Sequence, residues 1–370
     1  MPVASPKKTP RAPRGAHSYK RAGIRPRATE ADALIVGGGL VGGVLASALA
    51  GAGLSVAVVD TEKPPRDDAK NYDGRVSAIA LSSKRLLEGI GAWRALESCA
   101  TPIRHIRVAE AGTTDYLHYD AREIGGEPFG YMVENRILRR ELGRGLARGS
   151  DIRLFAPARI AILERGAFGV EARLADGRRI RAALAIAADG ANSRTRAEAG
   201  IGVARRGYGQ TAIVCTVRHE RPHGHIAHEI FHPSGPFAIL PTSGNRSAIV
   251  WSERSEQARL FAALDEDEFG LELTRRAGDF LGRMRLETPR WTYPLSVRFA
   301  HRMVAERLVL AGDAAHAMHP VAGQGLNMGL RDAAASGRSV PARGPNRDRG
   351  RGPSPSRAHR PRRRRPASPC

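Results

Sequence analysis

The sequence predicts an α/β fold that combines a parallel sheet with an antiparallel one, and three observations support this prediction. Residues 33–59 form an uncharged stretch whose glycines divide it into strand, helix and strand. Two later apolar runs, 182–188 and 308–311, each end beside an acidic residue and a glycine, as buried strands of open α/β sheets do. Residues 208–253 alternate between apolar and polar positions instead, which indicates antiparallel strands.

The first stretch, residues 33–59, holds 27 residues without a charge and is long enough for a transmembrane helix. Seven of these residues are glycine, and each glycine destabilises a helix interior by about 1 kcal/mol, so we reject that interpretation. We expect strands at 34–36 and 54–59 and a helix at 40–52.

Three glycines at the first strand–helix junction, Gly37, Gly39 and Gly42, form the pattern G-x-G-x-x-G. In such a motif the first glycine makes the turn, the second admits a pyrophosphate, and the third lets helix and strand pack closely. Asp60 follows Gly42 by 18 residues, where a carboxylate can bond a ribose hydroxyl. The motif therefore predicts a Rossmann-type domain for an adenine dinucleotide, either FAD or NAD.

Most of the net charge of +22 lies in the two ends of the chain. Residues 1–29 hold eight Lys or Arg and no acid, and residues 336–370 hold eleven Arg and one Asp, which leaves +4 for residues 30–335. We predict disordered extensions at both ends, with a transit peptide as the alternative at the first. Its five prolines oppose the amphipathic helix of such a peptide. No aromatic residue lies within the second end, so we expect no specific nucleic-acid partner.

Between residues 60 and 202 the pattern predicts both helices and strands. Arg75 is either a surface charge or a bidentate ligand for a pyrophosphate, and Asn135 begins a helix from which it could reach a bound ligand. The expected elements are a helix capped by Ser82 or Ser83 and ending near 90, strands at 103–110 and 114–119, a helix at 135–148, and a meander of 153–154, 158–164, 169–174 and 178–181.

The strand predicted at 182–188 ends in Asp189 and Gly190, and a polar segment containing Arg196 follows it. Ligands of open α/β sheets lie at such strand ends, so this segment is a candidate site. Further along, the pattern predicts antiparallel strands at 212–217, 226–231, 237–240 and 247–251, helical structure over 256–284, and a strand at 291–297.

Residues 307–332 are the second informative stretch. The buried strand at 308–311 ends in Gly312 and Asp313, and after Pro320 the glycines Gly323 and Gly325 begin a helix. A carboxylate at a strand end can hold a ribityl or ribose hydroxyl. Glycines at a helix start expose N–H donors to an anionic ring oxygen.

Residues 219–223 read His-Glu-Arg-Pro-His and match the zinc motif H-E-x-x-H. A zinc site needs both histidines on one face of a helix, and Pro222 removes the turn that would bring them together. We therefore predict no metal site. Cys99, Cys215 and Cys370 contain no C-x-x-C pair, which argues against a dithiol centre and fits a reducing, cytoplasmic location.

A resemblance to a known family rests on four motifs in this order: GGGLVGG with Asp60, DGRVSAIALSS, ADGANSRTR and LAGDAAHAMHPVAGQGLNMGL. They resemble the FAD-dependent aromatic hydroxylases, the class A flavoprotein monooxygenases. The segments YGQTAIVCTVRHERPH, HEIFHPSGPFAILP and WTYPLS resemble the ubiquinone-biosynthesis branch. The resemblance covers about residues 32–335.

The resemblance implies FAD as cofactor, NAD(P)H as cosubstrate and hydroxylation of an electron-rich ring with O2. It implies that Arg75 and residues 189–196 serve the pyrophosphate and the nicotinamide cofactor, and that Asp313 binds the ribityl chain. Pro320, Gly323, Gly325, Leu326 and Asn327 would border the flavin ring, and Phe237, Ala238 and Leu240 would face the substrate. The substrate would be an aromatic phenol, prenylated and membrane-borne, met at the inner membrane face or in a biosynthetic complex. No catalytic base is singled out.

The family's fold implies an antiparallel substrate domain inserted into the FAD-binding domain. We assign residues 30–104, 132–202 and 298–335 to FAD binding, and 105–131 and 203–297 to the substrate domain. Residues 336–370 contain one Val and no Leu, Ile, Phe or Met, whereas such proteins continue with apolar helices, so we hypothesise a frame shift near Ala335. Another flavin oxidoreductase of the same fold, a reductase or halogenase, and a truncated inactive product are the alternatives.

Overall fold

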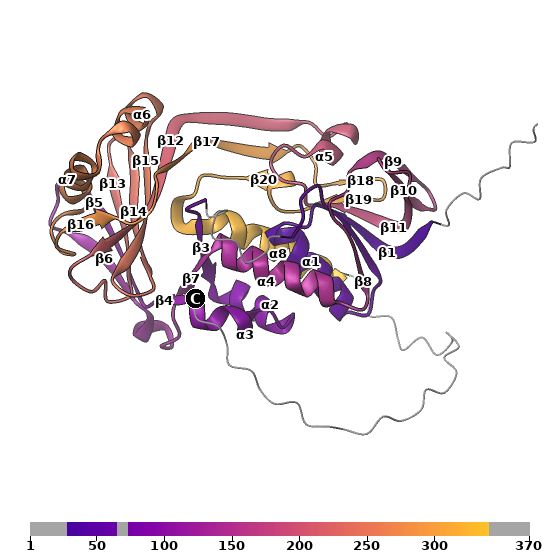
Figure 1. Cartoon of the computed structure of the whole chain (residues 1–370), viewed down its shortest axis with the longest axis horizontal. Coiled ribbons are helices and arrows are strands. Elements are labelled where there is room, and N and C mark those ends of the chain that lie inside the picture. The colour runs from indigo at the N-terminus through magenta and orange to yellow at the C-terminus, as the bar shows by residue number, and fades with distance from the viewer. Residues whose placement is uncertain (1–27, 65–72, 340–370) are drawn as a thin grey trace, which may run out of the picture.

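The computed structural model describes residues 28–64 and 73–339, which form two large sheets, a small third sheet and the helices between them (Figure 1). The Rossmann-type sheet has the strand order β18-β19-β11-β1-β2-β8, with β10 and β9 added beside β11. Its strands are β1 (Thr29–Val36), β2 (Val56–Val59), β8 (Ile152–Phe155), β9 (Ile160–Gly166), β10 (Gly169–Leu174), β11 (Arg179–Ala187), β18 (Val304–Ala305) and β19 (Leu308–Leu310).

The centre of this sheet is parallel, as the apolar runs predicted. β1 pairs in parallel with β2 and β11, β11 with β19, and β2 with β8. The carboxyl ends of β1, β11 and β19 therefore meet at one edge, which brings residues 37, 188 and 311 together from distant parts of the sequence.

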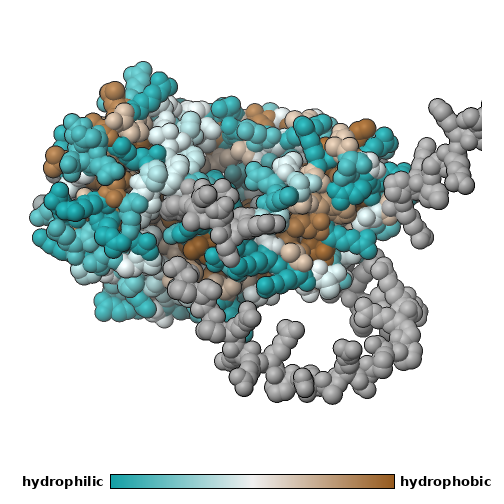
Figure 2. Space-filling view, in the orientation of Figure 1, coloured by the Kyte–Doolittle hydropathy of each residue, from teal (hydrophilic) through white to brown (hydrophobic). Residues whose placement is uncertain are grey.

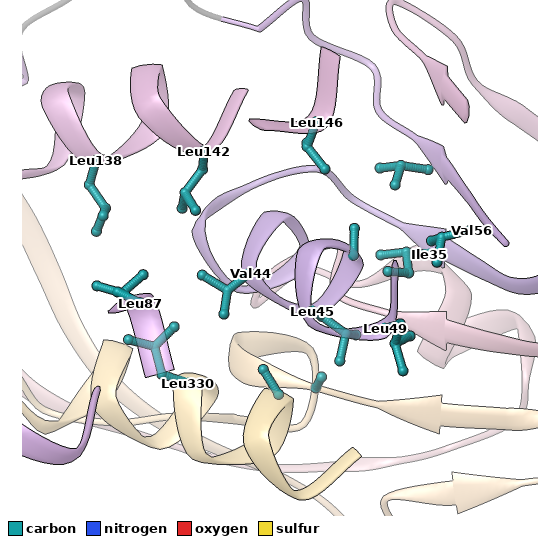
Figure 3. Close-up of a cluster of buried hydrophobic side chains, with 14 of the residues drawn as sticks. Ile35, Val44, Leu45, Leu49, Val56, Leu87, Leu138, Leu142, Leu146 and Leu330 are labelled. Atoms are coloured by element: carbon teal, nitrogen blue, oxygen red, sulfur yellow. The ribbon is translucent and has the colours of Figure 1, made fainter. Parts of the chain in front are cut away.

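The helix α1 (Leu40–Gly51) is the core of this lobe. Val44, Leu45 and Leu49 on α1 are buried and contact leucines from three other helices (Figure 3). These helices are α2 (Leu81–Gly89), α4 (Asn135–Arg148) and α8 (Gln324–Ser339). Gly329 allows the closest approach, because a Cβ there would lie 2.5 Å from Val41 Cγ2.

The second large sheet, which we call the antiparallel sheet, is antiparallel except for the parallel pair of β13 and β5, and has the order β20-β17-β12-β15-β14-β13-β5-β6, with β16 beside β12. Its strands are β5 (His105–Glu110), β6 (Tyr116–Asp120), β12 (Val203–His219), β13 (Ile226–His232), β14 (Gly235–Thr242), β15 (Arg246–Arg254), β16 (Met284–Leu286), β17 (Trp291–Ala300) and β20 (His316–Ala317). In Figure 1 the long strands β12 and β17 extend from this lobe to the Rossmann-type lobe.

Two helices, α6 (Ser255–Ala263) and α7 (Glu266–Ala277), pack on one face of the antiparallel sheet. The opposite face is turned toward a small sheet of β3 (Val76–Ala80), β7 (Gly130–Glu134) and β4 (Thr101–Ile103). Ile103, Met132 and Ala227 form the apolar contact between the two sheets. Short helices complete the described part, among them α3 (Trp93–Leu96) and α5 (Arg194–Glu198).

Three expectations of local structure were wrong. Residues 152–155 belong to the Rossmann-type sheet through β2 rather than to the meander. The strands expected at 178–181 and 182–188 are one strand, β11, which pairs with β1 from 180 to 187. On its other side β11 pairs with β10 at its start and with β19 at its end. The helix α2 begins at Leu81 without a side-chain cap, because Ser83 Oγ donates to Asn327 Oδ1 instead.

The basic ends lie almost wholly outside the described residues. Of residues 336–370, expected to be disordered and proposed to follow a frame shift near Ala335, residues 336–339 continue α8 and the rest lie outside the described residues. Within 28–64 and 73–339, no helix combines the length and apolar character that crossing a membrane requires. Figure 2 shows a mostly hydrophilic face with small, scattered apolar patches.

Candidate active site

A cavity of about 800 Å³ lies between the two lobes. One end is lined by the strand ends of the Rossmann-type sheet and by the starts of α1 and α8, and the other by the open face of the antiparallel sheet. We call these the nucleotide end and the substrate end. The volume falls in the usual range for a small-molecule site.

The glycine motif shapes the nucleotide end through its backbone. A Cβ at Gly42 would lie 1.9 Å from the Gly37 carbonyl oxygen, and one at Gly37 would lie 2.4 Å from that of Ala188. Gly37 also adopts a φ of +100°, which favours glycine. Gly39 differs, because no atom lies within 4 Å of its Cβ position and it lines the cavity. The close packing at Gly37 and Gly42 and the open position of Gly39 match the surroundings that the motif predicts, and the contact of Gly39 with a pyrophosphate stays a prediction.

Two helix N-termini open into the same end. Leu40 and Val41 of α1 line the cavity, and α1 has no side-chain cap. The first turn of α8 lines it with Gln324, Gly325 and Leu326. The N–H groups of a first turn lack helical partners and carry a partial positive charge, so both helix starts are suited to an anionic ligand.

Two carboxylates predicted to bind the cofactor differ in their surroundings. Asp60 accepts hydrogen bonds from the backbone N–H groups of Gly38, at 2.5 Å, and Glu62, at 2.8 Å, and so holds the glycine turn to the end of β2. Asp313 lines the cavity and has no hydrogen-bond partner among the described residues. Its carboxylate is open to the cavity but enclosed by protein walls, and this burial raises its pKa. Asp313 is therefore available to a ligand hydroxyl.

Arg75 and Asn135 also line the cavity. Arg75 Nε donates to Asp73 Oδ2 at 2.7 Å, and its guanidinium lies 5.7 Å from the ring centre of Tyr293. Asn135 Oδ1 accepts a hydrogen bond of 2.6 Å from Ser77 Oγ. Arg139, which the sequence did not single out, lies 3.8 Å from Asp73 and adds a second cation to this wall.

Several predicted residues support the site from behind its wall. Asp189 accepts from the Thr195 N–H at 3.1 Å and from the Ser193 hydroxyl. Arg196 is buried and donates to the carbonyls of Ala314 and Ala191. Neither lines the cavity, whereas Gly190 does, so the expectation of direct cofactor contact was wrong for Asp189 and Arg196. Their side chains bond the protein instead.

In residues 312–327, too, some of the predicted residues line the cavity and others support it from behind. Pro320, Gly323, Gly325 and Leu326 line the cavity, whereas Gly312 does not and donates its N–H to Asp332 Oδ2 at 2.9 Å. Asn327 also reaches the cavity, but its amide is fully used. Its oxygen accepts from the Ala80 N–H and the Ser83 hydroxyl, and its nitrogen donates to the carbonyls of Ala78 and Gly323. Asn327 therefore fixes the start of α8 against β3.

The substrate end is a wall of side chains mostly from alternate positions of four strands, with His228 on β13 as the exception. Ala238 and Leu240 line the cavity as expected, and Phe237 does not. Phe237 is fully buried on the opposite face, 5.9 Å from the ring centre of Trp251, in the core beneath α6 and α7. The prediction for Phe237 was wrong because successive strand residues point to opposite faces.

Sequence reasoning missed most of this wall. Its cavity-lining residues include Ile106 and Val108 on β5, Ala227 and Glu229 on β13, and Val250 and Ser252 on β15. The alternation of polar and apolar residues identified the strands, but only the strand pairing shows which face is covered by helices.

The histidines of the H-E-x-x-H motif do not share a helix. His219 ends β12, and its ring nitrogens contact the Arg221 carbonyl and the Ser247 hydroxyl. His223 Nε2 contacts the Thr242 carbonyl. Within the described ranges, no group of three or more His, Cys, Asp or Glu side chains could hold a metal ion.

Comparisons with known proteins agree with this geometry. Residues 30–340 match the family model described as FAD binding domain. The chain is 54% identical over 304 residues to ubiquinone hydroxylase UbiL of Rhodospirillum rubrum, which covers 82% of this chain and 71% of the relative. It is 37% identical over 302 residues to 3-demethoxyubiquinol 3-hydroxylase of Escherichia coli, with 80% and 76% covered.

Solved structures show the same fold. PqsL of Pseudomonas aeruginosa, a probable FAD-dependent monooxygenase, superposes with a TM-score of 0.70 at 22% identity, over 84% of this chain and 86% of that one. The p-nitrophenol 4-monooxygenase PnpA of Pseudomonas putida superposes with a TM-score of 0.67 at 21% identity, over 85% and 80%.

Proposed function

The chain belongs to the FAD-dependent aromatic monooxygenases, in the family of the ubiquinone hydroxylases, and we propose that it hydroxylates the ring of a prenylated phenol, a ubiquinone precursor, with NAD(P)H and O2. The names of its relatives supply the substrate class, since they describe hydroxylation of ubiquinone and of demethoxyubiquinol. When bound, the flavin supplies the redox chemistry that connects NAD(P)H oxidation to O2 activation.

The observation that carries this proposal is the single cavity that joins two unlike ends. Asp313 and the open N–H groups of α1 and α8 fit the hydroxyls and the anionic groups of a flavin dinucleotide. Arg75 and Arg139 would hold negative charge from phosphate or nicotinamide cofactor. The wall of Val108, Ala238 and Leu240 would exclude water from an aromatic ring.

The test begins with the purified chain reconstituted with FAD. Anaerobic NAD(P)H should bleach the flavin absorbance, and labelled O2 with a short-chain prenylated phenol should then give a product that carries one labelled oxygen. Flavin reduction without oxygen incorporation would favour another flavin oxidoreductase of the same fold. Failure to bind FAD under any reconstitution condition would favour an inactive product.

We also propose that the substrate is taken from a membrane surface at the cytoplasmic side. Val108 and Ile106 on β5 lie opposite Leu117 and Tyr119 on the edge strand β6. Directly opposed residues share a face of the sheet, so the apolar wall continues onto Leu117 and Tyr119, which are 62% and 49% exposed. Such an exposed apolar strip fits a lipid surface or a partner of a biosynthetic complex.

Sedimentation with phosphatidylethanolamine–phosphatidylglycerol vesicles tests the membrane proposal. Leu117→Asp should reduce vesicle binding several-fold, because a charge would enter the apolar lipid boundary. Leu271→Asp on α7 is the matched control, since Leu271 is 73% exposed on the helix-covered side. Equal binding by all three proteins would contradict the membrane proposal, and a complex partner would remain to be sought.

The domain assignment stays a proposal as well. The sheet pairing supports most of it, because residues 105–120 and 203–254 pair in the antiparallel sheet, while residues 29–36, 152–187 and 304–310 pair in the Rossmann-type sheet. The boundary at 297/298 falls within β17, and β20 in the segment 298–335 pairs with β17 in the antiparallel sheet. Limited proteolysis of the FAD-bound chain would test whether cleavage concentrates at the proposed boundaries.

A further inference from the structure

Glu229 is the one feature of the substrate end that does not fit an apolar wall. It lies in the middle of β13, and its strand neighbours on the same face are Ala227 and Phe231. Across the sheet it lies opposite Ala238 on β14 and Val108 on β5. Val250 continues the same row beyond Ala238. A carboxyl group is thus surrounded by alanine, valine and phenylalanine.

No hydrogen bond or ion pair joins Glu229 to another described residue. The other charged side chains that line the same cavity are Arg75, Arg139 and Asp313 at the nucleotide end. Two histidines, His228 on β13 and His319 beside Pro320, also line it, and burial lowers the pKa of each, that of His228 to about 4. Glu110, which follows Val108 on β5, is exposed. Burial alone raises the pKa of Glu229 to about 7.

An unpaired carboxyl group in such a place destabilises the folded protein, because desolvation is not compensated by a partner. Groups of this kind are common where a ligand supplies the missing partner. The group that a phenol would bring into the cavity is its hydroxyl, a donor that matches a carboxylate acceptor.

We propose that Glu229 binds the phenolic hydroxyl of the substrate and accepts its proton during hydroxylation. This inference rests on the proposed function, which it deepens by naming the residue that recognises the ring substituent. Glu229 lines the same cavity as the flavin-binding residues, so a ring held by it lies between the apolar wall and the nucleotide end.

The proton transfer is balanced within the site. The phenolic O–H bond breaks as an O–H bond forms on Glu229, and the resulting phenolate donates electron density to the ring carbons that are hydroxylated. The proton held by Glu229 returns to the phenolate oxygen of the product. A carboxylate with a pKa near the working pH is effective in this role, since both of its protonation states are populated.

The first test is a binding experiment that needs no turnover. A short-chain prenylated phenol and its methyl ether are titrated into the oxidised, FAD-bound enzyme, and the change in flavin absorbance gives each dissociation constant. We expect the parent to prefer the phenol about tenfold to a hundredfold over the ether. Glu229→Gln should lose most of this preference, and Glu229→Asp should keep part of it.

Glu110→Gln is the matched control, because Glu110 lies on the neighbouring strand outside the cavity and should leave the preference unchanged. A substitution that only changed the shape of the cavity would weaken the binding of phenol and ether equally. The ratio of the two dissociation constants therefore reports the hydroxyl contact. The same ratio in parent and Glu229→Gln would overturn the inference, as would a parent that binds neither compound.

The second test is turnover against pH. Glu229→Gln should reduce the kcat for hydroxylation about a hundredfold and remove the limb of the pH profile near 7. Its FAD affinity should stay unchanged. A parent that hydroxylates the phenol while Glu229→Gln matches it in rate and pH profile would overturn the inference and leave the proposed function intact. A parent that discriminates phenol from ether without hydroxylating the phenol would contradict the proposed function and the proton transfer, and would leave only the contact between Glu229 and the hydroxyl.

Discussion

The two ends of the cavity are lined by different kinds of atoms, backbone atoms at the nucleotide end and side-chain atoms at the substrate end. At the nucleotide end the backbone forms the surface, through Gly39, Gly325 and the first turns of α1 and α8. At the substrate end the backbone is occupied by strand pairing, and side chains such as Ala238, Leu240 and Glu229 form the surface. The shape of the nucleotide end therefore depends on the absence of side chains at its glycines. The shape and polarity of the substrate end depend on the side chains at alternate strand positions.

This difference predicts different sensitivity to substitution. A side chain added to the glycine motif collides with main-chain atoms that cannot move aside, whereas a side chain changed on the wall alters the size and polarity of the site. Four substitutions test this comparison, beginning with the largest expected effect.

Phe237→Ala should destabilise the protein by about 3–5 kcal/mol, because it leaves a cavity in the core shared with Trp251 and Phe269. Urea unfolding of the FAD-bound protein measures the loss. Ala238→Phe, one residue along on the cavity face, should instead leave stability nearly unchanged and exclude the substrate. A stable Phe237→Ala variant with a raised KM would show that Phe237 faces the substrate after all.

Gly42→Ala should weaken FAD binding roughly a hundredfold, because the new Cβ would lie 1.9 Å from the Gly37 carbonyl oxygen and would push α1 away from β1. Fluorescence titration of the apoprotein with FAD gives the dissociation constant. Gly51→Ala at the end of the same helix is the control, since no atom lies within 4 Å of its Cβ position. Equal FAD affinity in both variants would refute a backbone-built nucleotide end.

Glu229→Gln should stabilise the substrate-free protein by about 2 kcal/mol at pH 8, after allowance for water in the cavity. The folded-state pKa of Glu229, about 7, lies above its usual value of 4.5. Ionisation of Glu229 therefore lowers the stability of the parent as the pH rises from about 4.5 to 7, and this contribution is absent from the variant. Asp313 has a raised pKa too, but it is present in both proteins and cancels.

Urea unfolding at pH 5 and pH 8 measures this effect. The stability difference between the two proteins should be small at pH 5 and fully developed at pH 8. A parent that is the more stable protein at pH 8 would mean that Glu229 has a partner in the folded state, and that the substrate end is not an uncompensated apolar wall.

The same contrast explains how much could be predicted from the sequence. The residues of the nucleotide end could be predicted because this end is built from glycines and strand ends, which have recognisable sequence patterns. The surroundings that the motifs indicate are found at Gly37, Gly39, Gly42 and Asp313. Local patterns also identified α4 over its full length, since its apolar residues repeat at helical spacing.

The residues that line the substrate end could not be predicted from such patterns. Alternation in 237–240 identifies a strand, but Phe237 and Ala238 exchange faces if the face covered by α6 and α7 is assigned wrongly. Glu229 looked like an ordinary polar position of an alternating strand. Its isolation among Val108, Ala238 and Ala227 arises only when β5, more than 100 residues earlier in the sequence, pairs with β13 beside β14.

Asp189→Ala should have the smallest effect and tests where the nucleotide end stops. Asp189 bonds Thr195 and Ser193 at the start of α5, so its loss should reduce stability by about 1 kcal/mol and change FAD affinity less than about threefold. Ser193→Ala is a matched control, because it removes the bond to the Arg196 N–H from the same turn. If Asp189→Ala weakened FAD binding tenfold at unchanged stability, its carboxylate would contact the cofactor directly. The nucleotide end would then depend on side chains as the substrate end does.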